Sequence, residues 1–219
     1  MVDGCKEAVK GGCIVVDLDG TLIKGNSTKL LAIFVAKKLL GKGHFMYLFS
    51  LCFLIFLNLT RLTPHNRMKH RLLEISNLVL NENDVDIFSS RLAKIVNNDV
   101  LEIFRQNNEK QILIATAAAD FFLSRFIDYL EIKADFTATP FTKRKEDYIE
   151  KKGERKLQSV KDYLKRNNLS LDIFITDHYD DLPLLKYNRG KNYLINPSKK
   201  TLSKIKDLQL MIDEIITNS

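Results

Sequence analysis

The sequence predicts an α/β fold in which a doubly wound parallel sheet is interrupted by an inserted all-helical region. Short apolar runs rich in β-branched residues alternate with helix-like segments after position 107, and one such run stands near the N-terminus. No strand pattern lies between Thr21 and Lys110. Because strands separated by helices favour a parallel sheet with right-handed crossovers, we expect an α/β core of residues 1–24 and 107–219. Residues 25–106, hereafter the insertion, are expected to be helical.

The core is expected to contain five short strands with helices between them. The strands are expected at Cys13 to Val16, Gln111 to Thr116, Ala134 to Thr137, Leu171 to Thr176 and Tyr193 to Ile195. Helices are expected at Asp120 to Leu130, Glu154 to Arg166 and Leu182 to Tyr187, with one or two more at the C-terminus. Residues 140–152 are charged and irregular, which predicts a hairpin or an exposed loop.

The insertion is expected to hold several helices around one very apolar run. Asn26 or Ser27 can cap a helix that ends near Leu40. The run from Phe45 to Leu59 is the most apolar stretch of the chain, and Thr63-Pro64 then opens a basic helix that continues to about Ser76. Two further helices are expected at Asn83 to Val96 and Asp99 to Arg105.

Composition limits the class of protein and its partners. With 219 residues, 45% hydrophobic and 28% charged, the chain is globular and long enough for one α/β core with an inserted subdomain. The net charge of +7 favours anionic partners such as phosphate esters, nucleic acid or an anionic membrane. Cys5, Cys13 and Cys52 lack metal-ligand spacing and are expected to be free thiols in a reducing compartment. The first twelve residues show no secretory signal, so a cytoplasmic location is expected.

Two carboxylates directly follow the first predicted strand, at Asp17 and Asp19, before Gly20 turns the chain. Open α/β sheets bind ligands beyond the carboxyl ends of their strands, and side chains at i and i+2 point the same way. Two acids so close repel one another, and a divalent cation is the simplest remedy. The alternative is a solvated turn with no ligand.

A hydroxyl follows the second expected strand. Thr116 precedes three alanines, whose small size lets a ligand approach closely. The hydroxyl and the adjacent backbone N–H groups could bind phosphate oxygens at the start of the next helix. The alternative is an ordinary helix cap.

The hexapeptide Asp17-Leu18-Asp19-Gly20-Thr21-Leu22 resembles the first motif of the haloacid dehalogenase (HAD) superfamily, in its phosphatase branch. Thr116 stands where the second motif of that family is expected. Gly153-Glu154-Arg155-Lys156 is similar to the lysine-bearing third motif of the phosphoserine-phosphatase-like branch, and Lys161 is an alternative lysine one turn later. Asp177 and Asp181 resemble the fourth motif, although Thr176 and His178 replace the glycine and serine that usually flank its first acid.

The resemblance implies a Rossmann-like core with a helical cap and a two-step phosphoryl transfer. It makes Asp17 the nucleophile that forms an aspartyl-phosphate, and Asp19 the general acid and base. It implies Mg²⁺ held by the side chains of Asp17 and Asp177 and by the backbone carbonyl of Asp19. Thr116 and Lys156 would bind the phosphate, and Asp181 would support the site. The expected activity is hydrolysis of a phosphate monoester.

The insertion bears on the substrate. Residues 20–73 contain no Asp or Glu, and Asn26 stands where phosphoserine phosphatases place a glutamate for the substrate's amino group, which disfavours an amino-acid phosphate. A basic, acid-free segment around a run too short to span a bilayer is typical of a helix lying in an anionic membrane interface. Similar apolar caps occur in phosphatidylglycerophosphate phosphatases of this superfamily and in phosphatase-like domains attached to membrane prenyltransferases. We therefore hypothesise a lipid or polyprenyl phosphate substrate and peripheral membrane attachment.

Three alternatives stay open from the sequence. The run from Phe45 to Leu59 could instead form the core of the insertion or a dimer interface. The substrate could be a soluble phosphometabolite such as a sugar or nucleotide phosphate. The chain could also be a non-catalytic membrane-binding or partner-binding module. No nucleic-acid partner is expected, because no interleaving of aromatic and basic residues accompanies the charge.

Overall fold

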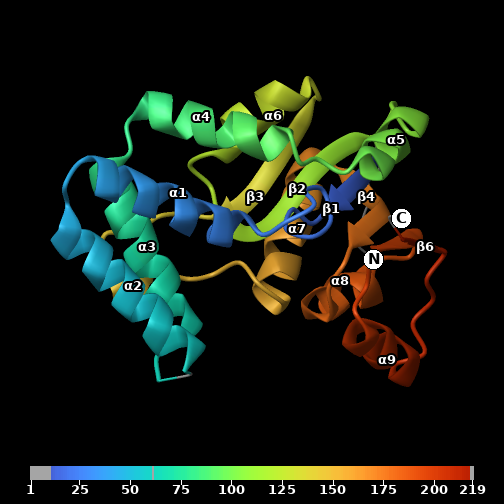
Figure 1. The fold of residues 1–219 in the computed structure, drawn as a ribbon. Coiled ribbons are helices and arrows are strands. Elements are labelled where there is room, and N and C mark those ends of the chain that lie inside the picture. The colour runs from blue at the N-terminus through green and yellow to red at the C-terminus, as the bar shows by residue number, and fades with distance from the viewer. Residues whose placement is uncertain (1–10, 61, 218–219) are drawn as a thin grey trace, which may run out of the picture.

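The computed structural model describes residues 11–60 and 62–217, and its centre is a six-stranded sheet in which every pairing is parallel (Figure 1). The strands lie in the order β3-β2-β1-β4-β5-β6. Their bounds are β1 Gly11–Val16, β2 Gln111–Ala119, β3 Ala134–Thr139, β4 Leu169–Thr176, β5 Lys191–Ile195 and β6 Glu214–Ile216. This confirms the α/β fold with a helical insertion, since no described strand lies between β1 and β2.

The helices divide between the insertion and the core. In the insertion they are α1 Ser27–Gly41, α2 Phe45–Leu59, α3 His65–Val79, α4 Glu82–Ala93 and α5 Asn98–Gln106. In the core they are α6 Leu123–Leu130, α7 Glu154–Asn167, α8 Leu182–Tyr187 and α9 Lys199–Asp207. Short 3-10 turns occupy Lys145–Asp147 and Tyr179–Asp181.

Strand β1 is buried on both faces, as its β-branched sequence predicts. Ile14 and Val16 pack in one hydrophobic cluster with residues of α4, α5 and α6. Cys13 and Val15 point the other way, into a cluster with residues of α7, α8 and α9. Alternate residues of one strand therefore serve two helix layers, which is the doubly wound arrangement.

The carboxyl ends of three neighbouring strands meet where the functional residues stand. Val16 pairs with Ile114 of β2 on one side and with Ile175 of β4 on the other. From β1 the strand order runs through β2 to β3 on one side and through β4 to β6 on the other, so the order reverses beside β1. Open α/β sheets bind ligands at the carboxyl ends of the strands where the order reverses. The residues following Val16, Ile114 and Ile175 therefore gather at one edge.

Helices α1, α2 and α3 of the insertion pack together beside this edge, where α1 contacts β2 (Figure 1). Helices α4 and α5 pack on the face of the sheet with α6. Asn26 caps α1 as expected, because its side chain accepts a hydrogen bond from the Lys29 N–H. α3 begins one residue later than expected, with Pro64 as its N-cap. α4 begins one residue early, because Asn81 and Asp84 form a capping box.

The structure corrects four expectations. The C-terminal segment contains one described helix, α9, followed by strand β6, which was not expected. α6 begins at Leu123 because β2 extends to Ala119. Residues 140–152 are not simply an exposed loop, since Tyr148 and Glu150 are buried. The apolar run of α2 is not the core of the insertion, because Leu51 is its one fully buried residue.

Candidate active site

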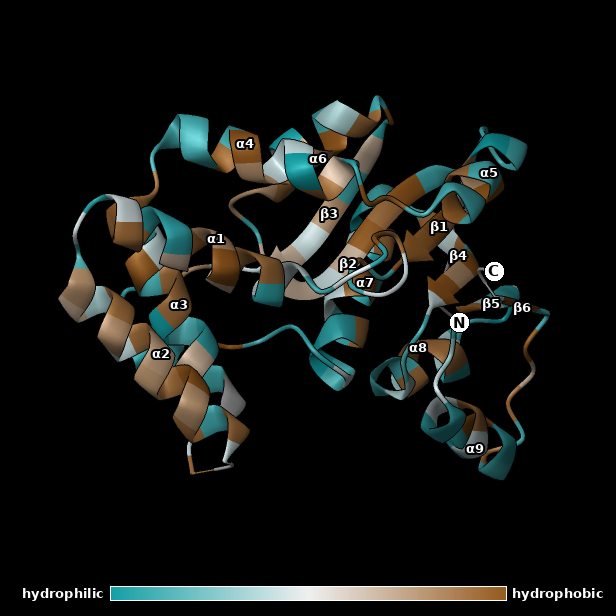
Figure 2. Ribbon diagram, in the orientation of Figure 1, coloured by the Kyte–Doolittle hydropathy of each residue, from teal (hydrophilic) through white to brown (hydrophobic). Residues whose placement is uncertain are grey.

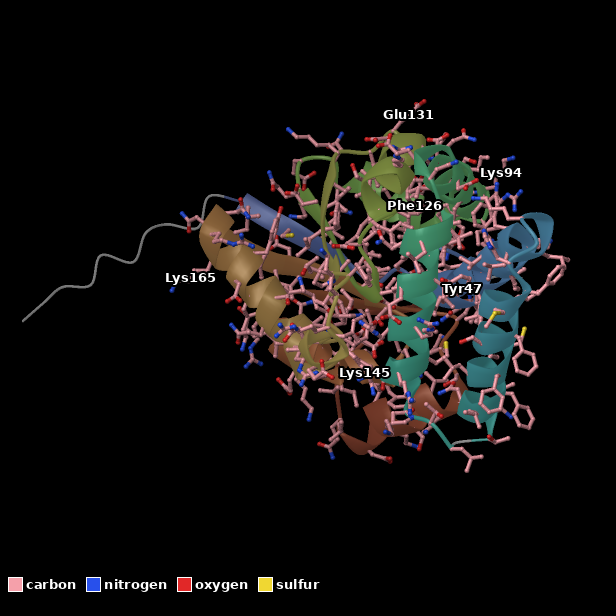
Figure 3. All side chains as sticks on the ribbon, turned by 90° about the vertical axis from the view of Figure 1, so that its left-hand side faces the viewer. Tyr47, Lys94, Phe126, Glu131, Lys145 and Lys165 are labelled. Carbon is pink, nitrogen blue, oxygen red and sulfur yellow. The ribbon has the colours of Figure 1, made fainter. Side chains whose placement is uncertain are left out.

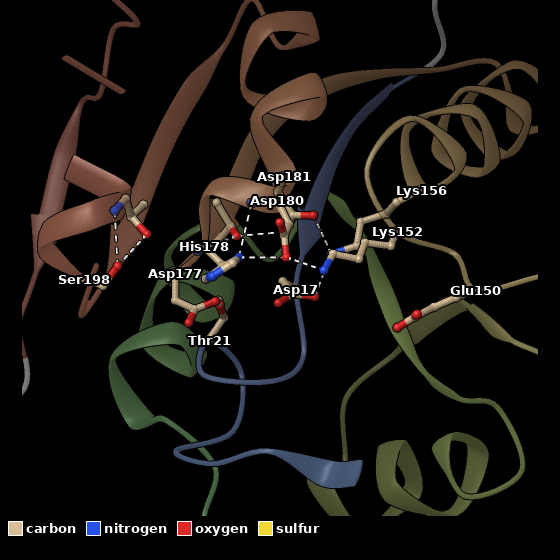
Figure 4. A network of polar contacts seen from close by, with 12 residues as sticks. Asp17, Thr21, Glu150, Lys152, Lys156, Asp177, His178, Asp180, Asp181 and Ser198 are labelled. Atoms are coloured by element: carbon tan, nitrogen blue, oxygen red, sulfur yellow. Dashed lines mark hydrogen bonds and ion pairs between the residues drawn. The ribbon is translucent and has the colours of Figure 1, made fainter. Parts of the chain in front are cut away.

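A buried cluster of one lysine and two carboxylates lies at the carboxyl end of β1 (Figure 4). Asp17 follows β1, Lys156 stands in the first turn of α7, and Asp181 begins α8. Lys156 Nζ lies 2.8 Å from Asp17 Oδ1 and 2.7 Å from Asp181 Oδ1. The structure thus brings three of the predicted site residues, Asp17, Lys156 and Asp181, into contact. The alternative lysine, Lys161, instead lies over the ring of Tyr187.

The electrostatics of this cluster follow from its burial. Burial raises the pKa of the Asp17 carboxyl; the Lys156 ammonium opposes this, and Asp181 and Asp177 reinforce it. Burial alone would lower the pKa of Lys156, but the two carboxylates raise it above its usual value. Lys156 is therefore a fixed cation beside Asp17, in a position to neutralise an anion bound there.

Thr176 explains one departure from the usual fourth motif. Its buried hydroxyl donates a 2.8 Å hydrogen bond to Asp181 Oδ2 and accepts one from the His178 N–H. Asp181 therefore has one oxygen on Thr176 and the other on Lys156. His178 in turn accepts a hydrogen bond from the Asp180 N–H through Nδ1, which shapes the turn before α8.

Asp177 lies against the turn that follows Asp19. The Thr21 hydroxyl donates a 3.3 Å hydrogen bond to Asp177 Oδ1 (Figure 4). A Cβ at Gly20 would lie 2.4 Å from Asp177 Oδ2, and Gly20 has a φ of +79°, so glycine is required here on two grounds. Burial raises the pKa of Asp177 to about 6, although nearby His178 opposes this.

The carboxylates of Asp17 and Asp177 and the backbone carbonyl of Asp19 are ligands that suit a magnesium ion. Asp17 is buried and Asp177 partly buried; Asp177 raises the pKa of Asp17, and Asp181 raises the pKa of both, so a cation between them would relieve the cost of ionising both. In residues 11–60 and 62–217, no group of three or more His, Cys, Asp or Glu side chains has the arrangement of a metal site. Two carboxylates with a backbone carbonyl and water suit Mg²⁺, which keeps several waters and binds through one or two carboxylates.

Asp19 is hydrogen-bonded to the insertion. Its Oδ1 accepts a 2.7 Å hydrogen bond from the backbone N–H of Ser27, the first residue of α1. Burial raises the pKa of Asp19, and the Ser27 N–H opposes this. Asp19 therefore lies at the junction between core and insertion with a pKa above its usual value, which suits the role of a general acid.

Thr116 lies in β2, two residues beyond the pairing of Ile114 with Val16, so it is level with the loop that follows β1. It is buried, and its hydroxyl oxygen accepts a 3.0 Å hydrogen bond from the Ala118 N–H. The strand continues to Ala119, so the helix N-terminus expected directly after Thr116 is absent and α6 begins only at Leu123. Any phosphate contact from this strand therefore comes from Thr116 and its neighbouring backbone.

A cavity of about 10 Å³ lies between α1, α3 and β2, where the insertion meets the sheet, and it has room for about one water molecule. None of the six predicted site residues lines this cavity. Its polar lining consists of Ser27, Thr28, Lys69 and Tyr148. The Ser27 hydroxyl is buried without a hydrogen-bond partner. Larger hollows of about 600 Å³ elsewhere are lined by none of the six predicted site residues.

Two contacts fasten α3 to the core loop beside this cavity. The Lys69 ammonium pairs with the buried Glu150 carboxylate. His70 Nε2 lies 3.0 Å from the backbone oxygen of Thr142, and its ring packs edge-on against Tyr148. We call the Lys69–Glu150 pair the latch.

Sequence reasoning did not single out Ser27, Lys69 or Glu150 for the site. Lys69 and Glu150 lie 81 residues apart in the chain, and the packing of the insertion on the core brings them together. Ser27 contacts Asp19, eight residues earlier, through its backbone N–H, which no side-chain pattern signals. A weak signal existed for Lys69, since residues 20–73 contain no acid and any ion-pair partner had to come from elsewhere.

The haloacid dehalogenase-like hydrolase family model matches residues 14–186, a segment that holds all six predicted site residues. The chain belongs to this family. It is a HAD-like hydrolase, with the α/β core and helical insertion that the sequence predicts.

Solved structures resemble this HAD-like hydrolase in fold. A protein of unknown function from Bordetella pertussis Tohama I matches with a TM-score of 0.70 and 15% identity, over 95% of this chain and 99% of that one. A HAD family hydrolase from Salmonella enterica serovar Typhi gives a TM-score of 0.63 and 15% identity, over 94% and 67%. A phospho-aspartyl intermediate analogue of phosphoserine phosphatase gives 0.57 and 11%, over 94% and 93%.

No curated protein matches the sequence of this HAD-like hydrolase significantly. The comparisons support the relation to phosphoserine phosphatases in fold and give no support to the suggested relation to phosphatidylglycerophosphate phosphatases. The substrate therefore has to be argued from the residues of the chain.

Proposed function

We propose that this HAD-like hydrolase cleaves phosphate monoesters through an aspartyl-phosphate on Asp17. The observation that carries the proposal is the buried contact between Asp17 and Lys156 at the edge where β1, β2 and β4 end. A carboxylate nucleophile next to a fixed cation can approach the phosphorus of an anionic ester, because Lys156 offsets the repulsion between them. A binding module without activity would have no need for this arrangement.

The reaction has two steps. Asp17 attacks phosphorus, the ester P–O bond breaks, and the leaving oxygen takes the proton of Asp19. Asp19 then accepts a proton from a water molecule whose oxygen attacks the aspartyl-phosphate, which releases phosphate and restores Asp17. The raised pKa of Asp19 and its place between core and insertion support this assignment.

The surrounding residues position the phosphate. Lys156 and the Thr116 region would contact its oxygens, while Asp181 and Thr176 hold Lys156 in place. Asp17, Asp177 and the Asp19 carbonyl would hold Mg²⁺. When bound, the ion would supply positive charge that stabilises the transferring phosphoryl group.

The alcohol part of the ester would lie toward the insertion, where Ser27 and Lys69 line the small cavity. The unpartnered Ser27 hydroxyl and the Lys69 ammonium favour a substrate with oxygen acceptors near the phosphate. Asn26 caps α1 and residues 20–73 lack acids, so an amino-acid phosphate is disfavoured. A lipid or polyprenyl phosphate is our leading substrate class. A soluble sugar or nucleotide phosphate is the second, supported by the polar lining of the cavity.

The test is the substitution Asp17→Asn, assayed with an aryl phosphate in the presence of Mg²⁺. We expect complete loss of turnover, and loss in the unaltered protein when Mg²⁺ is chelated. Asp162→Asn, an exposed acid on α7, serves as the matched control and should retain activity. Full activity of the Asp17→Asn protein would rule out the proposed nucleophile.

A further inference from the structure

The outward face of α2 is apolar along its whole length. Six large side chains on it are 52–87% exposed: Phe45, Met46, Phe49, Phe53, Phe56 and Leu59. The opposite face, with Leu51 buried and Leu48 and Ile55 partly buried, packs toward the rest of the insertion. We call the six exposed residues the α2 face.

The α2 face is one continuous stripe. Its members recur at helical spacing from Phe45 through Phe49 and Phe56 to Leu59, which places them on one side of the 15-residue helix. The rings of Phe49 and Phe53 stack, with centroids 6.4 Å apart. Figure 2 shows α2 at the outer edge of the insertion with hydrophobic residues along most of its length, and Figure 3 shows its side chains projecting into solvent.

The exposed apolar area of the α2 face is large. An aromatic side chain offers about 150–250 Å² of surface, so the four phenylalanines alone leave on the order of 500 Å² exposed. That area equals roughly the largest apolar patch of an ordinary monomer, about 300–600 Å², before Met46 and Leu59 are counted. A surface of this kind has a partner.

The charges around α2 identify the partner as anionic. Residues 20–73 carry nine Lys and Arg and no Asp or Glu; Lys38, Lys69 and Arg71 pair with acids from outside this segment. Lys42 and His44 precede the helix, and Arg67 is exposed at the start of α3, which packs against α2. A second copy of this chain would bring two such basic surfaces together, so their repulsion opposes self-association through α2.

We propose that the α2 face docks on an anionic lipid surface, with the helix lying in the interface. No helix in the described part of the chain has the length and apolar composition to cross a bilayer, which fits a helix lying flat. Aromatic and aliphatic side chains would enter the boundary of the acyl chains, and the flanking basic residues would contact the headgroups.

Docking would also select the substrate, a conclusion that rests on the proposed phosphatase function. α3 separates the α2 face from the cavity, because α3 contacts α2 and contributes Lys69 to the cavity lining. A protein held by α2 would therefore keep its site one helix layer from the lipid headgroups. The expected substrate class is a lipid phosphate in the same membrane.

The test is flotation of the full chain with vesicles of phosphatidylcholine, with and without phosphatidylglycerol. We expect the protein to float with the anionic vesicles, with roughly tenfold weaker binding to neutral ones and at high salt. Phe49→Asp/Phe53→Asp should reduce flotation at least roughly tenfold, because two charges would enter the interface. The matched control, Leu208→Asp/Met211→Asp, alters exposed apolar residues of the C-terminal region and should float normally.

Three results would overturn the proposal. One is the absence of flotation of the unaltered protein with anionic vesicles. Another is flotation that the α2 substitutions do not change. The third is a dimer in sedimentation that Phe49→Asp/Phe53→Asp converts to a monomer, which would assign the α2 face to a second copy of the chain.

The Asp17→Asn protein should float normally, so failure of docking and failure of the proposed reaction are distinguished. Hydrolysis of a soluble aryl phosphate by Phe49→Asp/Phe53→Asp would show that this variant is folded.

Discussion

The backbone N–H of Ser27 donates a 2.7 Å hydrogen bond to Oδ1 of Asp19. The first residue of α1 is thus tied to the proposed acid and base of the core. Closure of the insertion and placement of the catalytic proton are therefore linked, since movement of α1 changes the surroundings of Asp19.

For Asp19→Asn we predict a loss of about 10²–10⁴-fold in turnover, the usual contribution of general acid–base catalysis. An aryl phosphate has a good leaving group, so its first step should survive and release a stoichiometric burst of phenol. An alkyl phosphate should show no burst. Rapid-mixing kinetics with both esters measure the size of the burst. A burst with the alkyl ester, or none with either, would contradict the role given to Asp19, and Asp17→Asn should give no burst with any ester.

For Lys156→Met we predict a fall of roughly 3–5 kcal/mol in the free energy of unfolding at neutral pH without Mg²⁺. The substitution leaves Asp17 and Asp181 buried without their shared cation. Urea unfolding measures the change. Lys161→Met, which removes a cation from the face of Tyr187, is the control and should cost far less. Equal stability of the two variants would show that the buried cluster is not held by Lys156.

For Glu150→Gln we predict faster hydrogen exchange in α3 and a higher KM for phosphate esters. The neutral amide cannot balance the Lys69 ammonium, and loss of a hydrogen bond between charged groups should raise the open population about tenfold or more. Glu74→Gln is the control, because Glu74 pairs with Arg71 on the same helix but at a more exposed position. Unchanged exchange in α3 would mean that the latch does not hold the insertion closed.

For Asp84→Asn we predict a pH-dependent loss of about 1–2 kcal/mol in the free energy of unfolding. Burial raises the pKa of Asp84, but hydrogen bonds from Lys38 and from the Asn81 N–H together outweigh it and lower the pKa below 3.8. The carboxylate therefore stabilises the fold above about pH 4, and this stabilisation is lost as pH falls through the lowered pKa. Unfolding curves of the two proteins should converge in acid. Glu82→Gln, at a highly exposed acid of the same helix, should show little effect at any pH.

Much of the fold was predictable because local signals agreed with tertiary structure. α8 has the expected bounds, α2 coincides with the apolar run from Phe45 to Leu59, and the strands that precede Asp17 and Asp177 end where the apolar runs end. β6 was missed because it has only three residues, Glu214–Ile216, and pairs at the edge with β5 through contacts that no local pattern encodes.

The site likewise has a part that was predictable from the sequence and a part that was not. The sequence motif places Asp17, Lys156, Asp177 and Asp181 at strand ends and helix starts, and the sheet order then brings them together. The latch could not be predicted, because Glu150 lies in a charged stretch where burial of one carboxylate has no periodic signature. It depends on how the insertion packs on the core.

The cavity of about 10 Å³ has a consequence for binding experiments. A phosphate ester is far larger than one water molecule, so a substrate whose leaving group occupies this cavity, as proposed above, would bind only when α1 and α3 have moved away from β2. The apparent dissociation constant of any such ligand then equals its intrinsic value divided by the fraction of open molecules. Substitutions that never touch a ligand, such as those at the latch, should consequently change the affinity of chemically unrelated ligands by the same factor.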